Sequence, residues 1–128
     1  MSTRAVYTFK DDHERFAVYK HHDGYPEGAA EFIQKAKALA WPGPRFEAAD
    51  FAAAFVAANK TSGGGVYLTT NYLAHGDLAY HYVISQRMGL WVDAYERKYD
   101  ENGEAKYKKI FAGSLNNFCA AFENKELV

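Results

Sequence analysis

The sequence predicts a single α+β domain in which an antiparallel sheet of five or six strands packs with helices on one face. The chain has 128 residues, which is the length of one domain. Segments that alternate apolar and polar residues open the chain and return in its second half, and two segments with helical spacing lie between them. The expected order is β-β-α-α-β-β-β-β-α. Strands joined by hairpins form an antiparallel sheet, and amphipathic helices cover its apolar face.

Two strands and a polar turn begin the chain. Residues 5–10 are rich in β-forming side chains, and Tyr7 and Phe9 share one face of that segment. Residues 16–20 have the pattern of a second strand, and the four polar residues 11–14 join the two. The pattern predicts a β-hairpin.

Two consecutive helices follow the hairpin. The first is expected over about residues 26–40, because Pro26 and Glu27 suit the first helical turn and residues 41–44, with two prolines, end it. The second is expected over about residues 47–59. The apolar positions expected to face the core are Ala29, Phe32, Ile33, Ala36 and Ala40 in the first helix and Ala48, Phe51, Ala52 and Phe55 in the second.

Strands return in the second half, over residues 66–70, 78–84 and 90–97. Leu78 and Tyr82 are expected on one face of the second of these. The dipeptide at 102–103, Asn-Gly, predicts a hairpin turn because it tolerates positive φ. Residues 105–111 would pair back as a last strand, although their lysines leave a helix possible, and Ser114 suits the N-cap of a terminal helix. Across the chain, the side chains predicted to be buried are Phe32, Ile33, Phe51, Phe55, Val92 and Phe118.

Composition narrows the function classes. Lys and Arg number 15 and Asp and Glu 16, so the formal net charge is −1 and no global basic field exists to hold nucleic acid. A hydrophobic fraction of 48% excludes intrinsic disorder. The single cysteine, Cys119, cannot form an internal disulfide, and the first residues lead into a strand without a signal-peptide pattern. We therefore expect a cytoplasmic protein.

The stretch before the first helix holds the densest set of chemically capable side chains. It places His22, Asp23 and Tyr25 at a strand-to-helix junction, where Asp23 is expected to accept hydrogen bonds from the open amides of the helix. A second loop carries His75 and Asp77. If the two loops meet at one end of the sheet, they form a polar, aromatic-lined site, which is our first choice for a ligand or partner contact. The alternative is a structural turn whose residues only hold the helix.

Metal binding is a weaker hypothesis for the same loops, and it would imply a metal-dependent hydrolase. No HExxH or paired CxxC spacing is present, and the adjacent His21 and His22 would point to opposite faces of a strand. Cys119 lies on an apolar helical stripe, which suits an inert core thiol, and the glycines at residues 63–65 precede a strand and not the helix that a phosphate loop needs. We therefore expect no catalytic residue, no metal and no cofactor.

A basic, tyrosine-containing segment supports another alternative. Arg97, Lys98 and Tyr99 lie near the lysine-rich residues 106–109, and cations beside stackable rings suit a nucleotide or single-stranded nucleic acid. The opposing interpretation is a solvated hairpin whose lysines protect a sheet edge from aggregation.

Protein binding is the function class that the sequence favours. Aromatic residues make up 16% of the chain, more than one small core needs. Several of them, including Trp41 and Trp91, are expected at the surface, where exposed aromatic side chains mark interfaces. We also expect a homodimer, because closed symmetric dimers are the commonest oligomers.

Three motifs resemble one protein family. They are HDGYPEG at residues 22–28, PRFEA at 44–48 and FVAANK at 55–60, the last followed by the glycine-rich loop. Together they are similar to a family of small proteins from bacteriophages, prophages and mobile elements, over about residues 3–96. The family carries no known catalytic residues. The resemblance implies an accessory protein that binds and blocks a host protein, including one of a defence system such as CRISPR.

Overall fold

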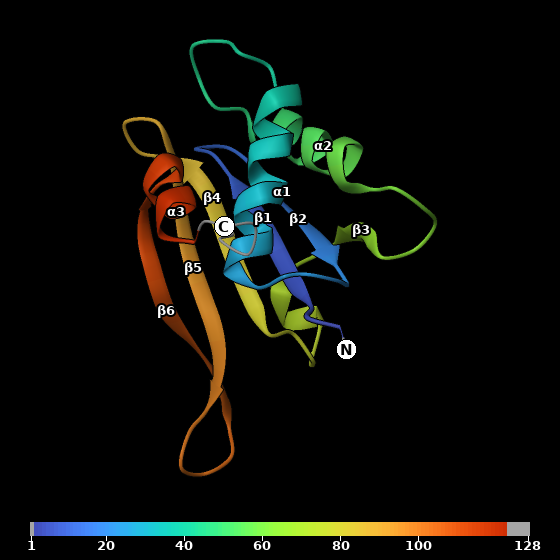
Figure 1. Ribbon diagram of the computed structural model, residues 1–128, viewed down its shortest axis with the longest axis vertical. Helices are drawn as coiled ribbons and strands as arrows, with labels where there is room; N and C mark the ends of the chain where they lie inside the picture. The colour runs from blue at the N-terminus through green and yellow to red at the C-terminus, as the bar shows by residue number, and fades with distance from the viewer. Residues whose placement is uncertain (1, 123–128) are drawn as a thin grey trace, which may run out of the picture.

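The computed structural model describes residues 2–122 and confirms the predicted α+β order of elements (Figure 1). The strands are β1 (Ala5–Lys10), β2 (Arg15–Lys20), β3 (Val66–Thr69), β4 (Tyr80–Gln86), β5 (Leu90–Tyr99) and β6 (Ala105–Ser114). The helices are α1 (Pro26–Leu39), α2 (Ala48–Asn59) and α3 (Leu115–Ala121), with a 3-10 turn, η1 (Tyr72–Ala74), before β4. Residues 105–111, for which the lysines leave a helix possible, are part of a strand.

The six strands form one sheet in the order β3-β2-β1-β4-β5-β6. The predicted antiparallel pairing is confirmed for every neighbouring pair except β1 and β4, which run parallel with Tyr7 opposite Tyr82. This pair arises because the chain leaves β2, forms two helices and β3, and then returns to the edge of β1 that β2 does not occupy. β1 is therefore a central strand with its first five residues buried.

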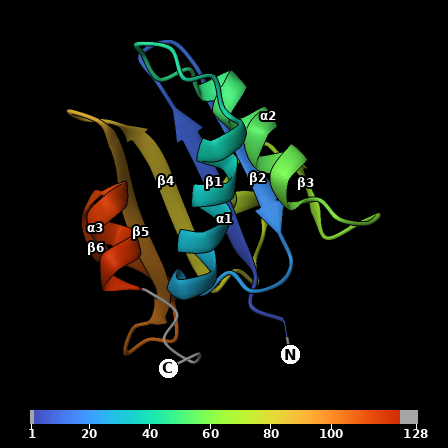
Figure 2. The ribbon, with the colours of Figure 1, turned by 45° about the horizontal axis from the view of Figure 1, so that its top comes forward.

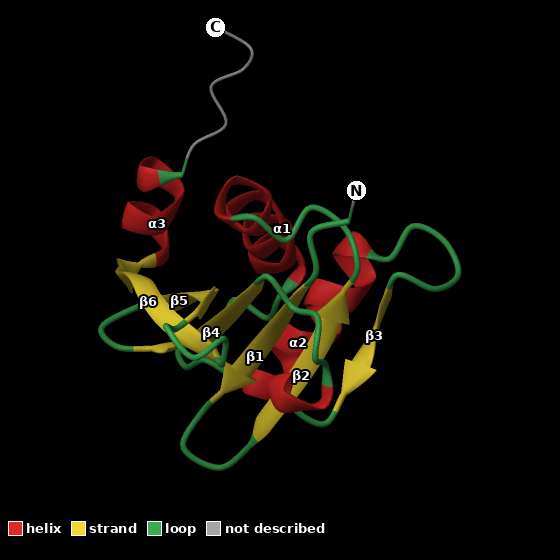
Figure 3. Ribbon diagram, turned by 90° about the horizontal axis from the view of Figure 1, so that it is seen from below, coloured by secondary structure: helices red, strands yellow, loops and turns green. Residues whose placement is uncertain are grey.

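The three helices pack on one face of the sheet (Figure 2, Figure 3). Tyr7 of β1 contacts Phe55 of α2 with ring centroids 4.5 Å apart, and it stacks on Tyr82 of β4 at 5.1 Å. Offset aromatic contacts of this kind add about 0.5–1.5 kcal/mol each to the area that they bury. The centre of the core is thus an aromatic cluster that ties both central strands to α2.

Five of the six side chains predicted to be buried are at most 4% exposed, namely Ile33, Phe51, Phe55, Val92 and Phe118. The prediction is wrong for Phe32, which is only half-buried. The ammonium of Lys20 lies 3.9 Å from the centroid of the Phe32 ring and donates a hydrogen bond to the His22 carbonyl at 3.0 Å. A cation held over an aromatic face keeps that face at the edge of the core.

We call the opposite side of the sheet the open face. The segment that holds η1 covers part of it, and Tyr72 stacks on the buried His81 of β4 with centroids 4.0 Å apart. Leu78 also packs on this side, beside Val6. The expected common face of Leu78 and Tyr82 is wrong, because β4 begins two residues after Leu78 and strand alternation does not extend to it.

The hairpin turn and the helix cap that the sequence predicts in the C-terminal part of the chain are both confirmed. Gly103 adopts φ 80° in the β5–β6 turn, as the Asn-Gly dipeptide predicts. The Ser114 hydroxyl caps α3 by accepting a hydrogen bond from the Asn117 amide at 3.1 Å. Within residues 2–122, no helix is long and apolar enough to cross a membrane.

Candidate functional site

The two loops singled out in the sequence come together at one end of the sheet, which we call the lower end (Figure 1). Tyr19 of β2 joins them: its ring stacks on His75 with centroids 4.5 Å apart, and its hydroxyl hydrogen-bonds to His21 Nδ1 at 2.8 Å. Tyr67 of β3 stacks on Tyr19 at 4.8 Å, and His22 meets the His21 ring edge-on at 4.6 Å. We call these five residues the histidine–tyrosine cluster.

The histidine–tyrosine cluster satisfies much of its own hydrogen bonding. His75 Nε2 bonds to Thr69 Oγ1 at 2.8 Å, and His22 Nδ1 bonds to Ser2 Oγ at 3.3 Å. Rings that are stacked and hydrogen-bonded within the protein have few polar atoms left for a ligand. The geometry therefore favours the interpretation in which these residues hold the loops in place.

The charged groups beside the cluster also indicate a structural role. Arg4 Nε forms an ion pair with Asp77 at 3.4 Å, which ties the N-terminal segment to the second loop. Burial and then the nearby Arg4 lower the pKa of His21, and burial raises the pKa of Tyr19. Both groups are therefore neutral at pH 7.

The strand-to-helix junction differs from the prediction at Asp23. The N-cap of α1 is Tyr25, which makes no side-chain capping bond, so the expected capping by Asp23 is wrong. Asp23 instead takes a left-handed conformation, φ 60°, which lets the chain turn sharply into the helix. The turn is tight because Gly28 lies so close to the Asp23 carbonyl that a Cβ would collide with it. Pro26 occupies the first helical turn as predicted, and Tyr25 is 41% exposed.

The basic segment lies on the β5–β6 hairpin, which extends past the rest of the sheet (Figure 1). Arg97 Nη1 donates to the Gly76 carbonyl, so this residue does join the loop of His75 and Asp77. Lys98 pairs with Glu96 at 3.2 Å, and Tyr99 is 67% exposed near the tip. Arg97 therefore contacts the lower-end loops, whereas Lys98 and Tyr99 follow it in β5, closer to the tip of the hairpin.

Metal and nucleophile chemistry gain no geometric support. Within residues 2–122, no three His, Cys, Asp or Glu side chains are grouped so that they could hold a metal ion. Cys119 is half-buried on α3, and burial raises the pKa of its thiol. A thiol with a raised pKa carries little of the reactive thiolate at pH 7.

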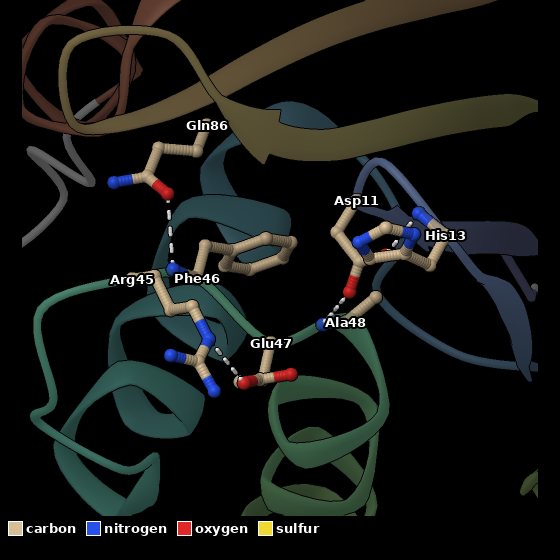
Figure 4. Close-up of polar contacts among 7 residues, drawn as sticks. All are labelled: Asp11, His13, Arg45, Phe46, Glu47, Ala48 and Gln86. Carbon is tan, nitrogen blue, oxygen red and sulfur yellow. Dashed lines mark hydrogen bonds and ion pairs between the residues drawn. The ribbon is translucent and has the colours of Figure 1, made fainter.

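The loop between α1 and α2 shapes the opposite, upper end of the molecule (Figure 1), and Figure 4 draws its polar contacts. The Phe46 amide donates to Gln86 Oε1 at 2.9 Å, and the Ala48 amide donates to Asp11 Oδ2 at 2.9 Å. Arg45 Nε pairs with Glu47 Oε1 at 2.7 Å. The loop is thus fixed both to the β1–β2 turn and to the end of β4, and a hollow lies on each side of it.

The larger hollow, of about 540 Å³, lies between this loop, the β4–β5 turn and the start of α3, and we call it the upper cleft. Its apolar lining includes Phe46, Phe51 and Leu115, and its rim carries Trp41 and Met88. Trp41 is 47% exposed, and Met88 is fully exposed. The upper cleft has the composition of a protein-docking surface, with an apolar floor and large exposed side chains at its edge.

The sequence predicts an exposed Trp41, but it does not reveal the upper cleft. The cleft unites residues 37–51, 86–90 and 114–116, which no motif links. Comparison with family models, curated proteins and solved structures gives no match to this chain. The function is therefore inferred from the geometry.

Proposed function

We propose that this chain is a non-enzymatic binding protein that docks a partner protein in the upper cleft. The observation that carries the proposal is the pair of exposed side chains, Trp41 and Met88, at the rim of an apolar hollow. Tryptophan is enriched among the residues that dominate binding energy, and methionine adapts its shape to a partner. Exposed apolar groups around a concave surface mark interaction sites.

The backbone of the upper cleft is held in place before a partner arrives. Trp41 donates its amide to Asp50 Oδ2 at 2.7 Å, and the guanidinium of Arg45 lies 5.7 Å from the centroid of the Trp41 ring. The hydrogen bonds that the Phe46 and Ala48 amides donate, drawn in Figure 4, fix the rest of the loop. A preformed surface loses little conformational entropy on binding, so more of the contact energy appears as affinity.

The resemblance to phage and mobile-element proteins suggests the setting. Small accessory proteins of such elements commonly act by occupying a surface of a host protein. We propose a cytoplasmic inhibitor of this kind, with a host defence protein as its target. An apolar side chain of the target would enter the upper cleft, and the charged groups at the rim, Lys37 among them, would form the polar border typical of interfaces.

The proposal is tested by capture from a host lysate with matched variants. Met88→Ser and Trp41→Ser remove exposed apolar groups at the cleft, and Leu73→Ser removes one of similar exposure, 73%, on the η1 segment. We expect one host protein to be retained in stoichiometric amount by the wild type and by Leu73→Ser, and to be lost with both cleft variants. Equal retention by all four proteins would contradict the assignment of the cleft.

A further inference from the structure

One row of side chains crosses the open face at its upper edge. Lys10 of β1 lies directly opposite Arg15 of β2. Lys10 and Ser85 each come one residue after the paired residues Phe9 and Ile84, so they are neighbours across β1 and β4. Phe9 and Ile84 face the helices, and strand alternation therefore places Lys10, Ser85 and Arg15 on the open face.

Neither Lys10 nor Arg15 forms an ion pair within the part of the chain that the structure describes. Like charges directly opposite each other on neighbouring strands repel, which destabilises the pair. Lys10, Arg15 and Ser85 line the smaller of the two hollows at the upper end, and a third cation, Arg87, lines it too. The guanidinium of Arg87 lies 5.4 Å from the centroid of the Trp91 ring. The row thus places two like charges side by side in a chain whose net charge is −1.

Ser85 adds a buried hydroxyl without a partner. The residue is 7% exposed, and its Oγ makes no hydrogen bond within residues 2–122. Two other described side chains, Tyr7 and Arg97, also have a buried polar atom without a bond, but only Ser85 lines one of the two upper hollows. Buried hydroxyls are almost always bonded, so an unbonded one beside three cations requires an explanation.

Three carboxylates border the same hollow, and two of them are already engaged. Asp11 accepts hydrogen bonds from the amides of Ala48, His13 and Glu14, and these bonds lower the pKa of its carboxyl. Glu47 pairs with Arg45 (Figure 4). The remaining carboxylate, Asp12, lies in the exposed β1–β2 turn. Asp11 and Glu47 are thus engaged, whereas the cations of the row form no ion pair among the described residues, so their charge is available to a ligand.

We propose that Lys10, Arg15 and Ser85 bind a phosphate group in this polar hollow of about 520 Å³. A guanidinium and an ammonium supply charge-assisted hydrogen bonds to phosphate oxygens. The Ser85 Oγ is buried in the ligand-free chain, and a change of its χ1 rotamer would turn it toward a phosphate oxygen in the hollow. Arg87 also lines this hollow and adds a further positive charge to it. This site lies on the other side of the α1–α2 loop from the upper cleft and does not depend on the function proposed for that cleft.

Calorimetric titration of the full chain with inorganic phosphate, in a chloride buffer at pH 7.5, tests the proposal. Ser85→Ala and Lys10→Met should each weaken phosphate binding by about tenfold or more, because a hydrogen bond to a charged group is lost. Ser62→Ala and Lys108→Met, at exposed positions outside the row, should leave the affinity unchanged. Asp12→Asn should strengthen binding, because it removes the unpaired carboxylate.

Two further titrations distinguish the phosphate group from other ligands. Acetate should bind much more weakly than phosphate, because it has fewer oxygens and a smaller charge at this pH. A nucleoside monophosphate that binds tighter than inorganic phosphate would support the site and identify a nucleotide as its carrier, and equal affinity would support free phosphate. Acetate binding equal to phosphate, or unchanged affinity in both Ser85→Ala and Lys10→Met, would overturn the proposal. Lys10→Met keeps the test valid if Ser85→Ala alters the fold.

Discussion

Two buried hydroxyls lie on the open face, and we expect their removal to change the stability of the fold in opposite directions. Thr8 Oγ1 bonds to His81 Nε2 at 2.8 Å, whereas Ser85 Oγ has no partner, and the two residues are 6% and 7% exposed. A buried polar group left without a hydrogen bond costs about 1–3 kcal/mol. Ser85→Ala removes that cost and loses less than about 1 kcal/mol of strand propensity, so we expect it to raise the free energy of unfolding by about 1 kcal/mol.

Thr8→Val is the matched contrast, because valine has the shape of threonine and suits a strand. It should lower the free energy of unfolding by about 1–3 kcal/mol, since it leaves the buried His81 nitrogen without a partner. Urea unfolding at pH 7 measures both variants through their midpoints at constant slope. A loss of stability in Ser85→Ala equal to that in Thr8→Val would refute the reasoning, because it would mean that Ser85 is hydrogen-bonded.

The same unfolding measurements, made with added phosphate, also test the proposed phosphate site. A ligand that binds only the folded chain stabilises it by about 1.4 kcal/mol at ten times its dissociation constant. We expect added phosphate to stabilise the wild type and to have little effect on Ser85→Ala. Equal stabilisation of both proteins would show that phosphate acts elsewhere.

Four further outcomes are expected. Burial and then the charge of Arg15 lower the pKa of His81 to about 4. The unfolded chain, with a pKa near 6.5, therefore binds the proton more readily, and stability is complete above about pH 6.5 and falls by up to about 3 kcal/mol toward pH 4. Unfolding of His81→Gln at a series of pH values should show a weaker dependence in that window. Phe55→Ala should cost about 3–5 kcal/mol in chemical unfolding, since its ring is fully buried; a smaller loss would mean that the site collapses around the cavity. His75→Ala should lower the melting temperature, and His22→Ala, which removes an exposed ring, should change it little; the reverse order would revive the ligand-site hypothesis for these loops. Light scattering should give twice the monomer mass of 14.4 kDa, and a monomer mass at high concentration would contradict the proposed dimer.

Periodicity in the sequence is sufficient to place the elements of this fold but not every strand pair. Helical spacing located α1 and α2 within one residue of their observed ends, because their stripes are long and bounded by proline or glycine. The parallel pairing of β1 with β4 joins strands about 70 residues apart. No local pattern encodes which free edge a returning strand will use, since that choice depends on the crossover and on the helices that it packs.

The candidate site shows the same division. The sequence indicates that His22 and His75 could form one site only if their loops meet at the same end of the sheet. Tyr19 joins the two loops in the structure, and its sequence pattern indicates only an ordinary strand residue. The row of Lys10, Arg15 and Ser85 depends on register across three strands, and register is a property of the folded sheet. A like-charge cross-strand pair becomes visible only once the strands are aligned.

The distribution of unfavourable features argues that binding occurs at the upper end. At the lower end, the rings of Tyr19 and His75 stabilise each other by stacking and hydrogen bonding. At the upper end, Ser85 is buried without a partner, and Met88 is fully exposed with φ 54°. A non-glycine residue in that conformation costs of the order of 1 kcal/mol, and no burial of its side chain offsets the cost. Stability alone would favour alanine at residue 85 and glycine at residue 88. Residues that lower stability are commonly kept where function needs them. Both residues are therefore best explained by contacts that form only when a phosphate group or a partner protein is bound.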